Sequence, residues 1–137
     1  NFTGQMTKEN LLSSEQLSLG GYSTVRGYET NESSGDEGIL LRNELHLPPI
    51  KPLHRLWKNR NDRLLFLFFW DYGIASNRKL VNNEDATRFL SSIGPGMRYE
   101  VDDKLSLRMD WGFQLKDSGE SPTGDNSRFE IGATVSY

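Results

Sequence analysis

The chain has 137 residues, enough for one ordinary domain, and its formal net charge of −3 gives no reason to expect nucleic acid. It contains no cysteine, which excludes disulfides and thiolate metal sites, and its two histidines are too isolated to suggest a metal site. No apolar run approaches the roughly 20 residues of a membrane-spanning helix, although membrane-spanning strands give a much weaker signal. We therefore expect neither a metal nor a cofactor.

The first part of the chain predicts the end of a strand followed by a long loop. Residues 2–7 alternate briefly, as the tail of a strand would, and without an initial methionine the chain is expected to begin inside a larger protein. From Ser13 to about Gly38 the residues are mostly Gly, Ser, Glu, Asn and Thr, with little periodicity. A loop of about 25 residues is uncommon in a compact domain unless the loop is functional.

The centre of this loop, Gly20 to Tyr28, carries one arginine between glycines and tyrosines. Glycine allows a positive φ and a close passage of the backbone, and the planar guanidinium of Arg26 suits a carboxylate held at fixed geometry. A candidate carboxylate is Asp71, which lies in the most apolar run of the chain. A lone charge there is costly unless it meets water or a partner, so we hypothesise that Arg26 and Asp71 meet across the loop.

Five later segments are predicted as strands, of which four alternate between apolar and polar residues and one, 64–75, is apolar on both faces through Phe69. They span residues 39–47, 64–75, 86–101, 104–115 and 129–137. The segment 104–115 has the cleanest pattern, because a helix would scatter its apolar residues around the whole circumference. In the segment 64–75 Asp71 lies opposite an aromatic stripe, which consists of Phe66, Phe68, Trp70, Tyr72 and Ile74.

These segments indicate an all-β antiparallel protein with about six strands and no convincing long helix. Strands of about 9–11 residues with one apolar and one charged face have the dimensions of a transmembrane β-barrel. The non-apolar face carries charges of both signs, as a watery lumen would, and the last strand stops on an aromatic residue. A soluble antiparallel sandwich would also alternate, so it stays an alternative.

Two motifs in order along the chain resemble those of the outer-membrane transporters of two-partner secretion, the haemolysin and filamentous-haemagglutinin secretion/activation proteins. Val25-Arg26-Gly27-Tyr28 matches the loop-tip motif of that family, and Phe69-Trp70-Asp71-Tyr72-Gly73 matches its Phe/Gly-x-Asp-x-Gly strand motif. The end of the chain resembles the C-terminal signal by which barrels are recognised for insertion, carried by Phe129, Ile131, Ala133, Val135 and Tyr137.

The resemblance implies a barrel of about sixteen strands, preceded by periplasmic POTRA domains, in which residues 1–137 supply about six C-terminal strands. Residues 13–38 would then be a loop that inserts into the lumen, where Arg26 pairs with Asp71 on the inner wall. The implied function is a pore in the bacterial outer membrane through which an unfolded partner protein is secreted. The implied partners are that polypeptide, the lipid bilayer with its lipopolysaccharide, and the barrel assembly machinery, with no nucleotide.

Other functions have less support from the sequence. An assembly factor that inserts other barrels shares both motifs, and a soluble β-rich binding module would share the alternation. An enzyme is not expected, because no arrangement of base and nucleophile is visible. The acidic segments 31–37 and 117–125 lack the spacing of a dedicated calcium loop.

Overall fold

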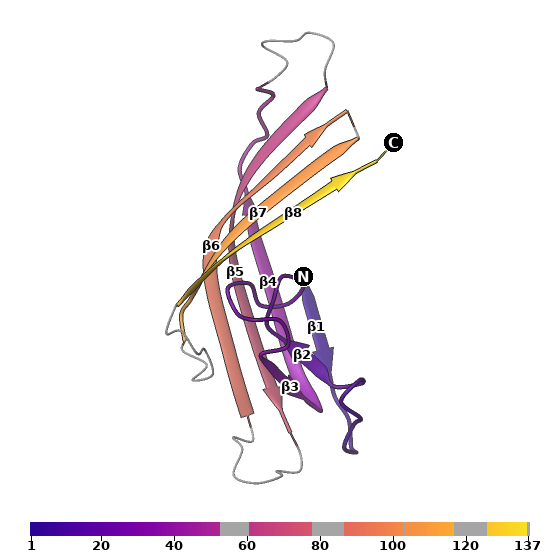
Figure 1. Ribbon diagram of the computed structural model, residues 1–137. Helices are drawn as coiled ribbons and strands as arrows, with labels where there is room; N and C mark the ends of the chain where they lie inside the picture. Colours follow the sequence, from indigo (N-terminus) through magenta and orange to yellow (C-terminus); the bar gives the residue numbers. More distant parts are fainter. Residues whose placement is uncertain (53–60, 78–86, 103, 117–125, 137) are drawn as a thin grey trace.

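The computed structural model is all-β (Figure 1) and describes residues 1–52, 61–77, 87–102, 104–116 and 126–136. Within these residues there are eight strands and no helix, and hence no helix that could span a membrane. The strands are β1 (Phe2–Gln5), β2 (Leu17–Leu19), β3 (Ser33–Gly35), β4 (Glu37–His46), β5 (Asp62–Ser76), β6 (Thr87–Val101), β7 (Leu105–Gln114) and β8 (Ser127–Val135).

One six-stranded sheet forms the body of the structure, in the order β1-β4-β5-β6-β7-β8. All of its neighbouring strands are antiparallel. The predictions of an all-β antiparallel class and of about six strands are therefore confirmed, and the bounds of the five long strands agree with the predicted segments within two residues. Closure of the sheet into a barrel stays a prediction.

The two faces of the sheet differ in what covers them, because side chains alternate along every strand. The apolar face is exposed and carries the predicted aromatic stripe, with Phe68 54% and Trp70 51% exposed. On the opposite face of β5, Leu67, Phe69 and Asp71 are at most 1% exposed. We call this the loop face, because β2, β3 and the loop residues Val25 to Tyr28 pack on it.

The hydrophobic core lies between the loop and the loop face of the sheet. Its main cluster joins buried loop residues with buried residues of β4, β5 and β6, and comprises Leu19, Val25, Tyr28, Leu40, Ala75 and Leu90. Gly73 makes room for it, because a Cβ there would lie 2.9 Å from Val25 and 3.0 Å from Leu19. The loop thus completes the core that the sheet alone lacks.

The loop contains two short strands that its lack of periodicity did not indicate. β2 and β3 pair there as a small antiparallel sheet, from Leu17–Gly35 to Leu19–Ser33. Each of these strands has three residues, which is too short to produce a readable alternation. Tyr137 and the acidic segment 117–125 lie outside the described residues, as does a brief helix that Leu53, Leu56 and Trp57 could form.

Candidate functional site

The tip of the loop reaches the sheet through glycines. Gly20, Gly21 and Gly27 have φ values of 100°, 91° and 89°, a region that favours glycine. Gly27 lies directly on Gly112 of β7, where a Cβ on Gly112 would be 2.6 Å from the Gly27 backbone. Only two residues without side chains allow the two backbones to come this close, and the contact sets the depth at which Arg26 enters the site.

Arg26 and Asp71 are brought together by this arrangement. The Nε of Arg26 donates to Oδ2 of Asp71 at 2.6 Å, and its Nη2 donates to Oδ1 at 2.9 Å, so the pair is bidentate. The backbone N–H of Arg26 also donates to Oδ2 at 3.2 Å. Both side chains are fully buried, and the guanidinium lies 3.8 Å from the centre of the Phe69 ring.

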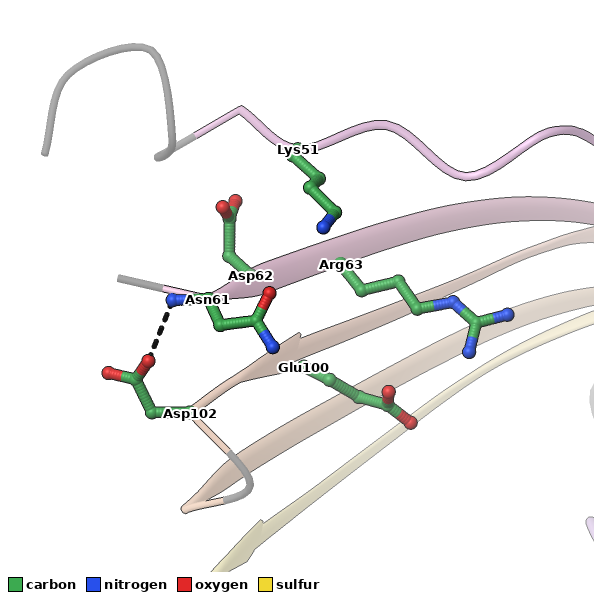
Figure 2. Close-up of a pocket in the computed structure, with 6 residues that line it drawn as sticks. All are labelled: Lys51, Asn61, Asp62, Arg63, Glu100 and Asp102. Carbon is green, nitrogen blue, oxygen red and sulfur yellow. Dashed lines mark hydrogen bonds between the residues drawn. The ribbon is translucent and has the colours of Figure 1, made fainter. Parts of the chain in front are cut away.

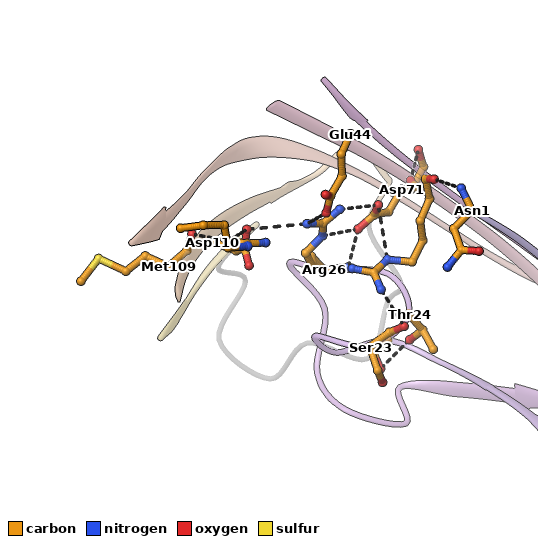
Figure 3. Close-up of polar contacts among 12 residues, drawn as sticks. Asn1, Ser23, Thr24, Arg26, Glu44, Asp71, Met109 and Asp110 are labelled. Atoms are coloured by element: carbon orange, nitrogen blue, oxygen red, sulfur yellow. Dashed lines mark hydrogen bonds and ion pairs between the residues drawn. The ribbon is translucent and has the colours of Figure 1, made fainter. Parts of the chain in front are cut away.

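Two further carboxylates face the same guanidinium (Figure 3). The Nη1 of Arg26 donates to Oε1 of Glu44 on β4 at 2.7 Å and lies 3.6 Å from Oδ1 of Asp110 on β7. Burial alone would lower the pKa of Arg26, but the hydrogen bonds and charges of Asp71, and then of Glu44, raise this pKa above its ordinary value. Arg26 therefore stays positively charged in the buried site.

Two arginines of the strands flank these carboxylates. Arg98 on β6 lies 3.0 Å from Oδ1 of Asp110, and Arg42 on β4 lies 3.9 Å from Oδ1 of Asp71. Arg42 also donates to the backbone oxygen of Ser23 in the loop at 3.1 Å. The resulting charge cluster is formally neutral and consists of Arg26, Arg42, Arg98, Glu44, Asp71 and Asp110. It connects the loop with four neighbouring strands, β4 to β7.

The remaining residues of the loop-tip motif are buried beside Arg26. Val25 and Tyr28 are fully buried, and the hydroxyl of Tyr28 lies 2.8 Å from the backbone oxygen of Ser91 and 2.6 Å from that of Lys116. The side chain of Gln114 donates to the backbone oxygen of Gly27 at 2.8 Å. The loop tip is thus held by backbone and side-chain contacts on β6 and β7 as well as by ion pairs.

The structure brings together only part of the residues that the sequence singled out. Residues 25–28 of the loop meet Phe69, Asp71 and Gly73 of β5, whereas the residues of the expected insertion signal lie on β8, away from the charge cluster. On β8 they occupy the exposed apolar face, with Phe129 58%, Ile131 63% and Val135 70% exposed. Tyr137 lies outside the described residues.

Sequence reasoning missed several partners of the loop tip: Glu44, Asp110, Gly112, Ser91 and Gln114. Alternation placed Glu44 and Asp110 on charged faces of their strands, but it does not tell which charged residue lies under the loop. The close contact of Gly112 and the backbone acceptor of Ser91 leave no sequence signal, because both depend on how the loop folds back.

A separate hollow of about 250 Å³ lies where β5 begins and β6 ends (Figure 2). It is lined by Lys51, Asn61, Asp62, Arg63, Glu100 and Asp102. Asp102 accepts a hydrogen bond from the backbone N–H of Asn61 at 2.8 Å. This polar group of the hollow therefore joins the start of β5 to the end of β6. Among the described residues no group of three or more His, Cys, Asp or Glu could hold a metal ion.

An antiparallel sheet with an exposed apolar face and a charged face under a long loop is typical of the wall of a transmembrane β-barrel. Comparison with known families agrees with this class. The model of the haemolysin secretion/activation proteins ShlB/FhaC/HecB matches residues 1–99. The chain therefore belongs to this family of two-partner secretion proteins.

The chain spans only a small part of the length of the curated relatives that it matches. The heme/hemopexin transporter protein HuxB of Haemophilus influenzae (strain 86-028NP) is 30% identical over 100 residues, which are 70% of this chain and 16% of HuxB. The outer membrane transporter CdiB of Dickeya dadantii (strain 3937) is 46% identical over 43 residues, 31% of this chain and 8% of CdiB. No solved structure gives a significant match. The family and these relatives place the chain in the bacterial outer membrane.

Proposed function

We propose that this chain forms part of the pore of an outer-membrane polypeptide transporter that secretes an unfolded partner protein. The observation that carries the proposal is the fully buried Arg26, which holds a long loop on the charged face of a sheet whose other face is apolar and exposed. In this proposal the loop face lines a watery lumen and the apolar face meets lipid. The pore acts by positioning and contact, without catalysis.

The whole transporter is larger than this chain. We propose that residues 1–137 are the C-terminal strands of a barrel of about sixteen strands, since the sheet ends in β1 and β8 and an open edge is not tolerated in lipid. Residues 13–38 would be the loop that enters the lumen. The barrel assembly machinery would recognise the apolar residues of β8 and Tyr137 as an insertion signal. Lipopolysaccharide would contact the barrel where it crosses the outer leaflet of the membrane.

The Arg26–Asp71 pair has a positioning role in this proposal. A buried ion pair contributes little net stability relative to apolar packing, but removing one of its partners is strongly destabilising because the other charge is left buried. The pair therefore determines where the loop sits more than it strengthens the fold. A loop fixed across four strands narrows the lumen, so its position sets the path that remains open for the secreted chain.

The test uses the full-length parent protein, produced together with its secreted partner. Arg26→Ala and Asp71→Ala are expected to reduce the partner in the medium at least tenfold at equal outer-membrane abundance of the transporter. Arg128→Ala is the matched control. Arg128 lies on the same face, but it is 42% exposed and its ion pair with Glu29 is long, at 3.6 Å. Unchanged secretion by both Ala variants would contradict the proposal.

The alternative of an assembly factor is separated by a second readout. Depletion of the parent protein is expected to leave the outer-membrane levels of unrelated barrel proteins unchanged while secretion of the partner stops. A general loss of other barrels would instead assign the chain to assembly. The soluble binding module is disfavoured by the large apolar side chains of the exposed face, which a soluble protein would have to cover.

A further inference from the structure

The pairing between β6 and β7 is interrupted beneath the loop tip. Ser92 and Ile93 pair with residues of β7, and pairing resumes at Gly96 with Asp110, but Gly94 and Pro95 have no partner on β7. Proline lacks the N–H that a ladder needs. The pairings of β4 with β5, β5 with β6 and β7 with β8 continue without such a gap. Among the long strands described, β6 and β7 are the one pair whose pairing has a gap.

The backbone of the loop tip lies over this interruption. Gly27 contacts Gly112, which stands between the two paired stretches of β7, and the side chain of Gln114 donates to the oxygen of Gly27 at 2.8 Å. Gly94 faces the same place, because a Cβ there would lie 2.8 Å from the ring of Phe69 and 2.9 Å from the carbonyl carbon of Trp111. The backbone of the loop at Gly27 is thus in direct contact with the backbone of β7 at Gly112.

The hydroxyl of Tyr28 contacts β6 and the chain just after β7, at the far end of the short paired stretch Ser92–Ile93 that borders the interruption. It lies 2.8 Å from the oxygen of Ser91 on β6 and 2.6 Å from the oxygen of Lys116, two residues after β7, and it accepts from the N–H of Ser91 at 3.2 Å. A phenol has one proton and two lone pairs, so it donates to one carbonyl at a time while it accepts the N–H. The ring is fully buried, which keeps water from replacing these bonds.

We propose that Tyr28 is a positioning residue that forms a second anchor of the loop, separate from the Arg26–Asp71 pair, and that this anchor holds the short paired stretch of β6 and β7 that lies between Tyr28 and the interruption. The first anchor lies on β4, β5 and β7, through Glu44, Asp71 and Asp110, and the second lies on β6 and on the residues just after β7. In the transporter proposed above, on which this inference rests for its functional meaning, the loop leaves the sheet only when both anchors break.

The test is amide hydrogen exchange of the full-length protein in detergent, with Tyr28→Phe compared with Tyr22→Phe. Tyr22 is the matched control, because it is a tyrosine of the same loop whose ring face, rather than its hydroxyl, contacts Arg108 at 3.0 Å. Tyr28→Phe is expected to accelerate exchange roughly fivefold in residues 90–97 and 109–116, since a buried hydrogen-bonding group is lost. Exchange in β4 and the middle of β5 is expected to stay as in the wild type.

A second variant reaches the same anchor from the strand. Gln114→Leu removes the bond to the oxygen of Gly27 and is expected to accelerate exchange in the same two stretches. The inference is overturned if Tyr28→Phe exchanges like Tyr22→Phe, or if exchange rises equally in all strands. Secretion is measured separately, because unchanged secretion by both Arg26→Ala and Asp71→Ala would contradict the proposed transporter function without changing the exchange result.

Discussion

Strands β5 and β8 both expose an apolar face, but they differ on the other face. β8 alternates between apolar and polar residues, whereas β5 is apolar on both faces through Phe69. Both expose large apolar side chains on one face, Trp70 at 51% and Phe129 at 58%. On the other face every second residue of β5 from Leu65 to Ala75 is buried, whereas that face of β8 has no fully buried residue among those described. The loop packs on β5 from Phe69 to Ala75, whereas β8 stays largely exposed.

This comparison shows that the core of the chain needs both an apolar strand face and the loop that packs on it. Alternation sorts side chains to two faces, but a face becomes an interior only where another segment covers it. Arg26, Tyr28 and Gly27 decide where that happens, because they bind the loop to particular strands. Variants that release the loop should therefore affect β5 far more than β8.

The largest effect is expected for Asp71→Ala. It leaves Arg26 buried with only Glu44 and Asp110 as acidic partners, and loss of one member of a buried pair costs about 3–5 kcal/mol. We expect a clear drop in the temperature at which the full-length protein unfolds in detergent, together with proteolytic cleavage within residues 13–38. An unchanged unfolding temperature and an uncleaved loop would show that the ion pair does not hold the loop.

A charge on the apolar face is expected to rank next. Phe68→Arg places a guanidinium in the middle of the aromatic stripe, which costs about 2–4 kcal/mol at the centre of a bilayer. Leu105→Arg, at the first residue of β7, is the control, since charges near the interface cost only about 0–1 kcal/mol. Folding into vesicles of defined lipid measures both. Equal folding of the two variants would contradict contact between the stripe and lipid.

A smaller effect is expected where the loop backbone meets β7. Gly27→Ala adds a Cβ 3.0 Å from Gly112 at a φ of 89°, and overpacking together with the left-handed conformation costs about 1–3 kcal/mol. Gly132→Ala is the control, because its Cβ would approach only the flexible end of Arg108, at 3.4 Å. Thermal unfolding in detergent compares them, and equal stability would argue against close backbone contact.

The smallest effect is expected for Arg128→Ala. Arg128 and Glu29 are 42% and 64% exposed and 3.6 Å apart, and exposed pairs of this kind contribute about 0–1 kcal/mol. We expect an unfolding temperature close to that of the wild type and normal secretion of the partner. A loss as large as that of Asp71→Ala would mean that the uncovered β8 and the covered β5 depend equally on the loop.

The sequence predicted the strands and their faces because period two is a local property of neighbouring residues. Asp71 could be placed opposite the aromatic stripe, and its need for a partner followed from the cost of a buried charge. Glu44 and Asp110 were visible only as charges on the polar side of their strands. Their convergence on Arg26 depends on strand register and loop path, which no local pattern encodes.

The short β2–β3 pair shows a second limit. Three-residue strands contain too few residues for an alternation, and the loop glycines that allow the close contacts with β7 look the same as those of any flexible segment. The interruption at Pro95 was hidden for a related reason. Proline is unusual inside a strand, but whether it breaks the ladder toward β5 or toward β7 depends on which way its nitrogen points.

The position of the loop in the chain has a consequence for the order of folding. Arg26 is separated from Asp71 by 45 residues, and Tyr28 is separated from Lys116 by 88. Contacts of such long range form slowly, because the intervening chain must first lose much of its freedom. The loop precedes Asp71 and Lys116 in the chain, so it docks on them only once the strands that carry them have formed. Until then its arginine stays hydrated, and docking of the loop is a late step in folding.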